Sequence, residues 1–244
     1  MEETSLEISS NPSDEKNEVL RLWELASPCV VLGRSSKWEE EINSVACQRD
    51  GVPVLRRVSG GASIVAGPGC LMYSVLISYQ RRPRWRSLDV AHLEVMTRVQ
   101  AAVQRATDLI HSSLQIMMEG TCDLTIANRK FSGNALRCKR NWMLYHGTIL
   151  YSMPLEWLTN YLFEPTRQPK YRRNREHESF VANVMDSSKE ISATVFRRIL
   201  ETQLAVTWNA SESWQSYPWK DIVDRESRHL LQSRYTNQQW HQCR

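Results

Sequence analysis

The sequence predicts an α+β fold with a mixed, largely antiparallel central sheet, helices mainly on one face and a smaller second sheet. Two observations lead to this prediction. Short segments rich in β-branched and aromatic residues recur between turn residues, and a long amphipathic helix stands between two groups of them. An apolar content of 41% in 244 residues is sufficient to fill the core of such a domain.

The alternation of apolar and polar residues, together with turn residues, predicts the first elements of the chain. A polar break at 11–18 separates a short helix at 2–9 from the segment VLRLWEL, and PCVVLGR ends at Gly33. A helix is expected over 39–49, with Ser35 and Ser36 as capping residues. Strands are then expected at VPVLRRV (52–58) and at CLMYSVLIS (70–78).

A long helix is predicted between Leu88 and His111. After Leu88 and from Leu93 onward, its apolar residues recur at steps of three and four, which aligns them on one face and indicates packing against a sheet. These residues are Leu88, Leu93, Met96, Val99, Val103, Ala106 and Ile110.

Strand patterns and turn residues also predict the elements in the second half of the chain. The stretch 122–152 predicts a strand, a tight turn at Ala127-Asn128, a second strand, a break at Gly133, and a strand through His146 to Tyr151. Helices are expected over 155–162 and 191–208. We expect three segments: a partial N-terminal helix and loop (1–18), one catalytic domain (19–210), and a helical C-terminal tail packed on the same domain (211–244).

Charge and cysteine content limit the class of protein. Lys and Arg exceed Asp and Glu by 31 to 27, an excess too small and dispersed to favour nucleic acid. The six cysteines form no CxxC pair or zinc-ligand pattern, so reduced thiols are expected. The polar start MEETSLEISS does not resemble a secretory signal, and no apolar run reaches membrane-spanning length. These features predict a cytoplasmic protein that binds neither nucleic acid nor a membrane.

The segment SGGASIVAGPG contains four of the nine glycines. Backbone without Cβ atoms lets N–H groups approach an anion or a flat ring closely, although a simple hairpin also needs glycine. Arg56 and Arg57 precede the segment, and their guanidinium groups suit a carboxylate or a phosphate. Because strand side chains alternate, one arginine should face the glycines and the other should point away.

Two further motifs contain residues that could bind a substrate or take part in a reaction. In the stretch from Asp123 to Gly133, Lys130 could bridge a substrate carboxylate and a nucleotide phosphate, or be a solvated surface charge. In His146-Gly147-Thr148, the histidine could act as a base or donor, but structural support is the favoured interpretation. A long basic loop could close over a nucleotide or simply be solvated. Its cations are Arg167, Lys170, Arg172, Arg173 and Arg175.

Taken together, RRVSGG, CDLTIANRKFSGNALR and YHGTILYS resemble, in order and spacing, the lipoate–protein ligase family, which shares its fold with biotin–protein ligases. The resemblance covers about 19–185, including the segment FVANV. It implies that ATP and Mg²⁺ activate lipoate or octanoate as acyl-AMP, and that a lysine of a lipoyl-domain acceptor then takes the acyl group.

The resemblance also implies roles for individual residues. Lys130 matches the family's substrate-contacting catalytic lysine, and Asp123 matches an acid of the adenylate and Mg²⁺ site. Further substrate- and nucleotide-binding positions are expected at Arg56, Arg57, Ser59, Gly60, Gly61, Ala62, Ser132, Gly133, His146, Gly147 and Thr148.

The sequence departs from the family pattern at three places. The third loop glycine is Ala62, the usual His-Asp pair is Ala66-Gly67, and the usual Gly-Asn pair is Gly69-Cys70. The C-terminal accessory domain of many such ligases has no counterpart, so a separate accessory chain is one expectation.

Two alternatives to a ligase therefore stay open. The first is an ATP-independent octanoyl or lipoyl transferase that uses a cysteine thioester at Cys122 or Cys70. The second is a non-catalytic acyl-binding module that retained the fold.

Overall fold

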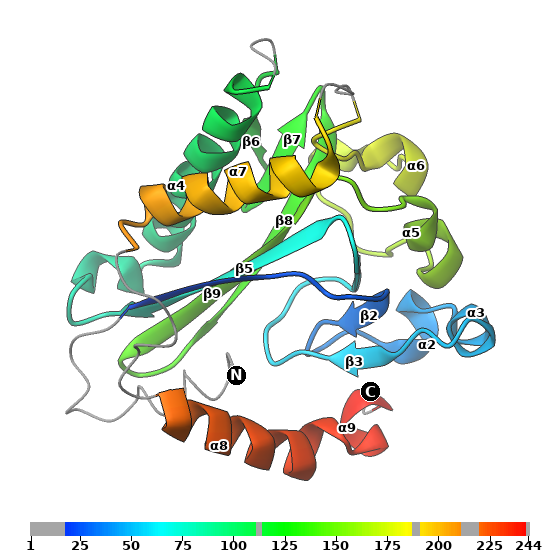
Figure 1. Cartoon of the computed structure of the whole chain (residues 1–244). Coiled ribbons are helices and arrows are strands. Elements are labelled where there is room, and N and C mark those ends of the chain that lie inside the picture. The colour runs from blue at the N-terminus through cyan, green and yellow to red at the C-terminus, as the bar shows by residue number, and fades with distance from the viewer. Residues whose placement is uncertain (1–17, 111–113, 187–190, 211–219, 243–244) are drawn as a thin grey trace.

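A computed structural model describes residues 18–110, 114–186, 191–210 and 220–242 (Figure 1). The helix expected at 2–9 lies outside these residues. No helix in the described part of the chain is long and apolar enough to cross a membrane.

The central sheet has six strands in the order β1-β5-β9-β8-β7-β6, and every neighbouring pair is antiparallel. Its longest strands form the middle of the sheet, where alternating side chains can be buried on both faces. The strands are β1 (Val19–Trp23), β5 (Cys70–Ser78), β6 (Met117–Glu119), β7 (Asp123–Ile126), β8 (Arg129–Cys138) and β9 (Trp142–Leu150).

A second, three-stranded sheet has the order β3-β2-β4. Strand β2 (Cys29–Leu32) pairs in parallel with β3 (Val54–Arg56) and antiparallel with β4 (Ile64–Ala66). The fold is therefore α+β with a largely antiparallel main sheet and a smaller second sheet, as the sequence predicts.

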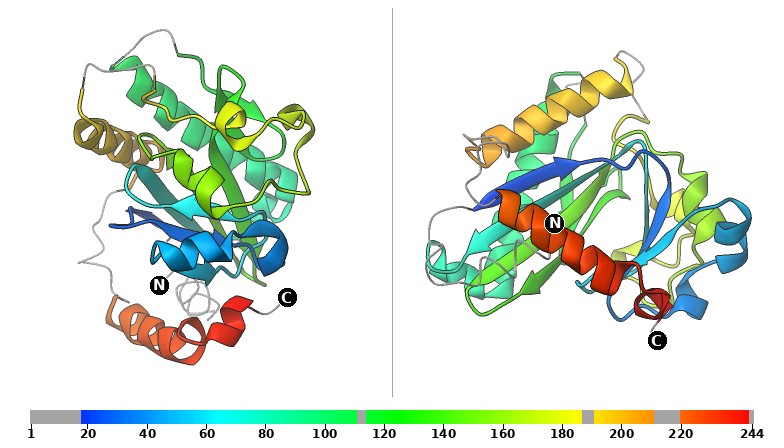
Figure 2. Two further views of the ribbon diagram at one scale, coloured as in Figure 1. Left: turned by 90° about the vertical axis from the view of Figure 1, so that its right-hand side faces the viewer. Right: turned by 60° about the horizontal axis from the view of Figure 1, so that its bottom comes forward.

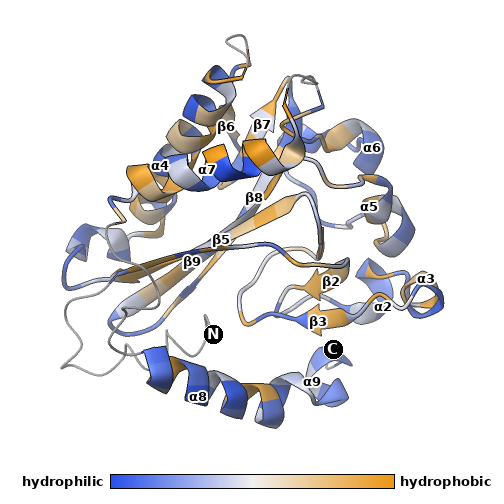
Figure 3. Cartoon of the chain, viewed as in Figure 1, coloured by the Kyte–Doolittle hydropathy of each residue, from blue (hydrophilic) through white to orange (hydrophobic). Residues whose placement is uncertain are grey.

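Two long helices, α4 (Leu88–Asp108) and α7 (Ala193–Thr207), pack together over one face of the central sheet (Figures 1 and 2). The ring of Tyr145 on β9 meets His92 of α4, whose Nδ1 lies 2.9 Å from the tyrosine hydroxyl oxygen. Apolar residues are concentrated in the strands beneath these helices (Figure 3). The small sheet and the candidate site therefore lie on the opposite face of the central sheet.

Short helices surround the small sheet and the C-terminal segment lies below it (Figure 1). The segment consists of α8 (Lys220–Leu230), the π-helix η4 (Leu231–Tyr235) and α9 (Gln238–Gln242), and α9 contacts β3. The remaining helical elements are α2 (Trp38–Glu41), α3 (Ser44–Arg49), η1 (Pro83–Arg86), α5 (Glu156–Tyr161), η2 (Lys170–Arg172) and α6 (His177–Phe180).

Two expectations about the helix at 39–49 are wrong. The helix predicted over 39–49 is divided into α2 and α3, because Asn43 caps the second helix by accepting from the backbone N–H of Ala46. Neither Ser35 nor Ser36 caps the first helix, whose N-cap is Lys37.

Gly133 does not break a strand. It lies within β8, between Asp123 of β7 and Thr148 of β9, and these two neighbours hold it in the sheet. Strands β4 and β6 were not expected from the sequence, because each has only three residues.

Candidate active site

Lys130 and Asp123 form an ion pair on the free face of the central sheet. The lysine Nζ lies 2.8 Å from Oδ1 of Asp123, and the two side chains are 29% and 12% exposed. The β7–β8 turn passes through Ala127 and Asn128, both with positive φ, and a register shift beside Leu124 places the lysine next to the acid. The expected tight turn is confirmed.

The glycine at position 133 leaves the space that Lys130 occupies. A Cβ at Gly133 would lie 2.9 Å from the Cε and 3.0 Å from the Nζ of Lys130. The lysine can therefore lie against the strand and keep its ammonium group beside Asp123 only because this side chain is missing.

Tyr171 connects the long basic loop to the ion pair. Its hydroxyl donates to Oδ2 of Asp123 at 2.6 Å, so each carboxylate oxygen of Asp123 has one partner. Burial, followed by the charge of Asp123, raises the pKa of Tyr171, which keeps the phenol protonated as a donor. The sequence indicated a functional loop but gave no signal that selected Tyr171.

The basic loop is folded against the domain through two of its five cations. Arg172 is buried, pairs with Glu164 and lies over the ring of Phe180, and Arg175 donates to the carbonyl of Asn128 at 2.9 Å. The segment that follows returns to Lys130, whose carbonyl accepts from the N–H of Ala182 at 3.0 Å. The other three cations, Arg167, Lys170 and Arg173, are exposed.

Arg57 organises the glycine loop. Its Nη2 donates to the carbonyls of Gly60 and Ala62, at 2.6 and 3.0 Å, and its Nε donates to Oγ of Ser59 at 3.2 Å. Gly61 has a φ of 92°, and a Cβ there would lie 2.9 Å from the same Nη2. Burial lowers the pKa of Arg57 to about 10, so the group remains a cation at neutral pH.

Ser59 links the loop to β9. Its Oγ lies 2.6 Å from Nε2 of His146. Burial, and then the charge of Arg57, lowers the pKa of His146 to about 3, so the imidazole is neutral at physiological pH. A neutral ring can share a hydrogen bond with Ser59 but brings no charge to the site, which agrees with the structural interpretation favoured from the sequence.

Arg56 points away from the glycine loop, as alternation along a strand requires. It is only 1% exposed, and its guanidinium donates to the carbonyls of Gly33, Ser36 and His241 at 2.7 to 3.2 Å. The structure thus brings Arg57, but not the guanidinium of Arg56, to the candidate site.

The other predicted residues lie on β8 and β9. Thr148 is the cross-strand neighbour of Gly133, and Gly147 is that of Asn134. Ser132 is buried, and its Oγ accepts from Nδ2 of Asn134 at 3.3 Å. Asn134 also accepts a hydrogen bond from Tyr73 and donates to the carbonyl of Cys122. These contacts link β8 to β5 and to Cys122, the residue before β7.

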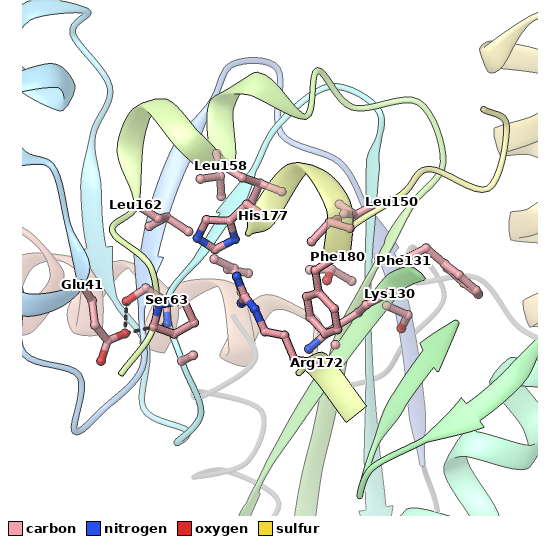
Figure 4. Close-up of a pocket in the computed structure, with 18 of the residues that line it drawn as sticks. Glu41, Ser63, Lys130, Phe131, Leu150, Leu158, Leu162, Arg172, His177 and Phe180 are labelled. Carbon is pink, nitrogen blue, oxygen red and sulfur yellow. Dashed lines mark hydrogen bonds between the residues drawn. The ribbon is translucent and has the colours of Figure 1, made fainter. Parts of the chain in front are cut away.

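Two cavities flank the glycine loop. The first, cavity A, has a volume of about 130 Å³ and contains Lys130. Figure 4 shows Lys130 and Arg172 on one side of it and three leucines on the other, with Glu41 accepting two hydrogen bonds from Ser63 at its far end. The lining of cavity A includes Ala62, Lys130, Gly133, Thr148, Phe163 and Arg172.

The second, cavity B, has a volume of about 500 Å³ and is lined by Arg57 and Ser59 at the start of the glycine loop. Ser59 and His146 line it together with apolar side chains and four arginines. The lining of cavity B includes Val31, Leu55, Ser59, Leu144, His146 and Leu231.

The two candidate nucleophilic cysteines are poor thiolates. Cys70 is completely buried, and burial raises its pKa to about 12. Burial and the neighbouring Asp123 raise the pKa of Cys122 to about 11, and its Sγ donates to the carbonyl of Asn134 at 3.2 Å. A thioester mechanism requires a thiolate, which neither environment favours.

The described residues contain no cluster of three or more metal-ligating side chains. Mg²⁺ in nucleotide enzymes is commonly held by one or two carboxylates together with phosphate oxygens. Asp123 fits this donor set as a single carboxylate, because each of its oxygens retains acceptor capacity beyond the bonds to Lys130 and Tyr171.

Comparison with solved structures defines the class of fold. The structure aligns with a bipartite lipoate protein ligase from Thermoplasma acidophilum at a TM-score of 0.71 and 20% identity, over 99% of this chain and 91% of that one. A lipoate-protein ligase A solved with ATP aligns at 0.69 and 20% identity, over 93% and 87%. The fold is that of a lipoate ligase catalytic domain.

Residues 2–205 match the family model of the lipoyl protein ligase A/B catalytic domain. The chain belongs to this family, which contains both lipoate ligases and octanoyl or lipoyl transferases.

Curated relatives include both kinds of enzyme. A probable lipoate-protein ligase A from Mycoplasma pneumoniae is 24% identical over 82% of this chain and 57% of its own length. A putative lipoate-protein ligase A from Schizosaccharomyces pombe is 30% identical over 57% of this chain, but only 35% of that protein is covered. The octanoyltransferase LipM from Carboxydothermus hydrogenoformans is 27% identical, over 91% and 86%.

Proposed function

We propose that this protein is an ATP-dependent lipoate–protein ligase that accepts lipoate or octanoate. The observation that carries the proposal is the position of Lys130, whose ammonium group lies beside Asp123 at the edge of cavity A and next to the Arg57 loop. A cation held in this manner lowers the repulsion between two anions that have to react.

The first step joins the acid to the nucleotide. A carboxylate oxygen of the fatty acid attacks the α-phosphorus of ATP, the bond to the β-phosphate oxygen breaks, and pyrophosphate leaves. Lys130 stabilises the negative charge shared by the carboxylate and the α-phosphate, while Arg57 and the backbone of the loop hold the reactants in place.

The second step transfers the acyl group. The uncharged amine of an acceptor lysine attacks the acyl carbon, the bond to AMP breaks, and the amine loses a proton. The acceptor is a lipoyl-domain protein, and a separate accessory chain is a further candidate partner. Mg²⁺ would be held by Asp123 together with the phosphates and would supply charge neutralisation.

The chemistry of the two linings suits different parts of the two substrates. Cavity A offers Lys130, Arg172 and the exposed ring of Phe163 to a nucleotide, whose phosphates are anionic and whose base is flat. Cavity B offers apolar walls and the neutral Ser59–His146 pair, an environment for an uncharged tail. The carboxylate and the α-phosphate would then meet at the glycine loop between the cavities.

The transferase is the second candidate, because the relative LipM is matched over nearly all of its length. Its chemistry needs a thiolate, and the raised pKa values of Cys122 and Cys70 argue against one at either position. A non-catalytic acyl-binding module is the third candidate, motivated by Ala62 and by the Ala66-Gly67 pair.

Mass spectrometry of a purified lipoyl domain tests the three candidates together. The domain is incubated with this protein, lipoate or octanoate and Mg²⁺, with and without ATP. A mass gain that requires ATP and is lost in Lys130→Ala is the expected result.

Two other outcomes overturn the proposal. Transfer from an octanoyl-loaded donor protein without ATP, with no reaction of the free acid, establishes the transferase. Tight octanoate binding with no transfer in either assay establishes the binding module.

A further inference from the structure

Cavity B has a wall that lies beyond the residues matched by the family model. The matched residues end at 205, whereas Leu230, Leu231 and Tyr235 from α8 and η4 line the cavity opposite Leu55 and Leu144. Figure 2 shows this C-terminal segment running beneath the sheets. Without it, the apolar side of the cavity would open to solvent.

The wall is anchored to β3 through the end of the chain. The N–H of Arg56 donates to Nδ1 of His241 at 2.9 Å, and the Arg56 side chain donates to the carbonyl of His241 at 3.0 and 3.2 Å. The indole N–H of Trp240 donates to the carbonyl of Arg56 at 3.1 Å. Strand β3 is an edge strand, so these bonds satisfy backbone groups that no neighbouring strand pairs.

The chemistry of the lining indicates an apolar occupant. Leu55 and Leu231 face the cavity while 40% and 54% exposed, and an apolar ligand would cover them. Four arginines also line the cavity. Arg56 on β3 and Arg57 next to it donate through their guanidinium groups to backbone carbonyls, Arg21 lies over the ring of Trp23, and Arg228 of α8 is exposed to solvent. The polar end of the ligand would then lie toward Ser59 and its tail toward Leu231.

We infer that the C-terminal segment, residues 220–242, forms the far wall of the acyl subsite and that Leu231 limits the chain length of the acid. This inference rests on the proposed function in one respect, that the ligand is a fatty acyl group. It assigns substrate selectivity to a part of the chain beyond the matched catalytic domain.

Two substitutions at one position test the wall in opposite directions. Leu231→Trp shortens the cavity, and Leu231→Ala lengthens it. Each methylene that loses its apolar contact should weaken binding about fourfold, so Leu231→Trp should lower the preference for octanoate over hexanoate about 15-fold if two methylenes are displaced. Leu231→Ala should raise the preference for decanoate over octanoate.

The matched control is Gln232→Trp, which places the same ring on the neighbouring exposed residue, outside the cavity lining. Selectivity is measured on the whole chain by ATP–pyrophosphate exchange with hexanoate, octanoate and decanoate, and melting temperatures confirm that each variant is folded. The control should keep the wild-type order of the three acids. If Leu231→Trp and Leu231→Ala both keep it as well, the inference is wrong.

Calorimetric titration with the same acids in the absence of ATP separates this inference from the proposed function. Wild-type protein that binds octanoate but catalyses no exchange contradicts the ligase alone, and the titrations of the Leu231 variants then decide the role of the wall. Wild-type protein that binds none of the acids contradicts both.

Discussion

The ammonium nitrogen of Lys130 lies 2.8 Å from Oδ1 of Asp123, and Tyr171 holds the other oxygen of the same carboxylate at 2.6 Å. One acid thereby fixes both the lysine of the sheet and the tyrosine of the long loop. Any ligand that draws Lys130 away from Asp123 also changes the environment of Tyr171, so the loop and the candidate catalytic lysine are coupled through a single side chain.

Replacement of Lys130 by alanine should lower the rate of acyl-AMP formation by a factor of about 100 or more. Removal of one group that stabilises transition-state charge typically costs this much. The rate is measured by ATP–pyrophosphate exchange. Lys139→Ala, on the distant β8–β9 turn, removes the same charge and should keep nearly the wild-type rate. Equal losses in the two variants would contradict a local role for Lys130.

Gly133→Ala tests the same lysine without changing it. The new Cβ would meet the Cε and Nζ of Lys130 at 2.9 and 3.0 Å, so the side chain has to leave its position beside Asp123. We expect the exchange rate to fall at least about tenfold, since small displacements of a reacting group are costly. The melting temperature shows whether the sheet itself is intact. A folded variant with an unchanged rate would show that the ion-paired position of Lys130 is not the one used in the reaction.

Tyr171→Phe should weaken the hold of the basic loop on the site. A hydrogen bond to a charged group contributes roughly 1.5 to 3 kcal/mol, which corresponds to a change of at least about tenfold. We expect a higher KM for ATP, with a smaller change in KM for octanoate if the nucleotide occupies cavity A. Tyr79→Phe also removes a phenol hydroxyl, one bonded to Cys138 away from the site, and serves as the control. Equal effects on both substrates would contradict a local role of the loop at the nucleotide.

Much of the fold could be predicted from the sequence because its signals are local. The nine-residue run of β5 and the heptad-like spacing of α4 determine a strand and a helix without any partner. Strands β4 and β6 have three residues each and exist only through pairing with neighbours, so no local pattern marks them. The division of α2 from α3 depends on one capping side chain, Asn43, in a segment whose composition favours a continuous helix.

The residues of the candidate site could likewise be predicted only where the sequence signal is local. Arg57, Lys130 and Gly133 could be selected from the sequence because the motifs RRVSGG and RKFSG are short. Each motif contains its charged residue and its glycines within a few positions. Tyr171 reaches Asp123, and Leu231 reaches cavity B, from segments that are 41 and 101 positions beyond Lys130, so only the folded chain brings them to the site. The opposite directions of Arg56 and Arg57 follow from strand alternation, but the partner of Arg56, His241, could not be predicted.

Cys122→Ser should retain acyl transfer to the lipoyl domain. Burial and Asp123 raise the pKa of this thiol to about 11, so it is almost entirely protonated at pH 7 and unsuited to forming a thioester. The assay measures transfer from octanoyl-loaded donor protein and from free octanoate in parallel. Selective loss of transfer from the donor protein would instead identify Cys122 as a nucleophile and support the transferase.

His146 should make the stability of the protein depend on pH between about 6.5 and about 3. Its pKa is lowered from 6.5 to about 3 by burial and by Arg57, so within this window the unfolded chain binds a proton that the folded chain does not. The free energy of unfolding therefore falls as the pH is lowered through the window, by up to about 1.4 kcal/mol per pH unit for this one proton, and it is independent of His146 above the window.

The variant His146→Asn isolates this contribution, because carboxylates and the other histidines titrate in both proteins and cancel in the difference. Asparagine keeps a polar group near Ser59 but binds no proton. Urea unfolding is measured at several pH values from 7 to 4. The stability of the variant should fall less steeply with decreasing pH than that of the wild type, even if it is lower at pH 7. Parallel curves would show that His146 takes up its proton with the same pKa in the folded and the unfolded chain, and that burial does not hold the imidazole neutral down to about pH 3.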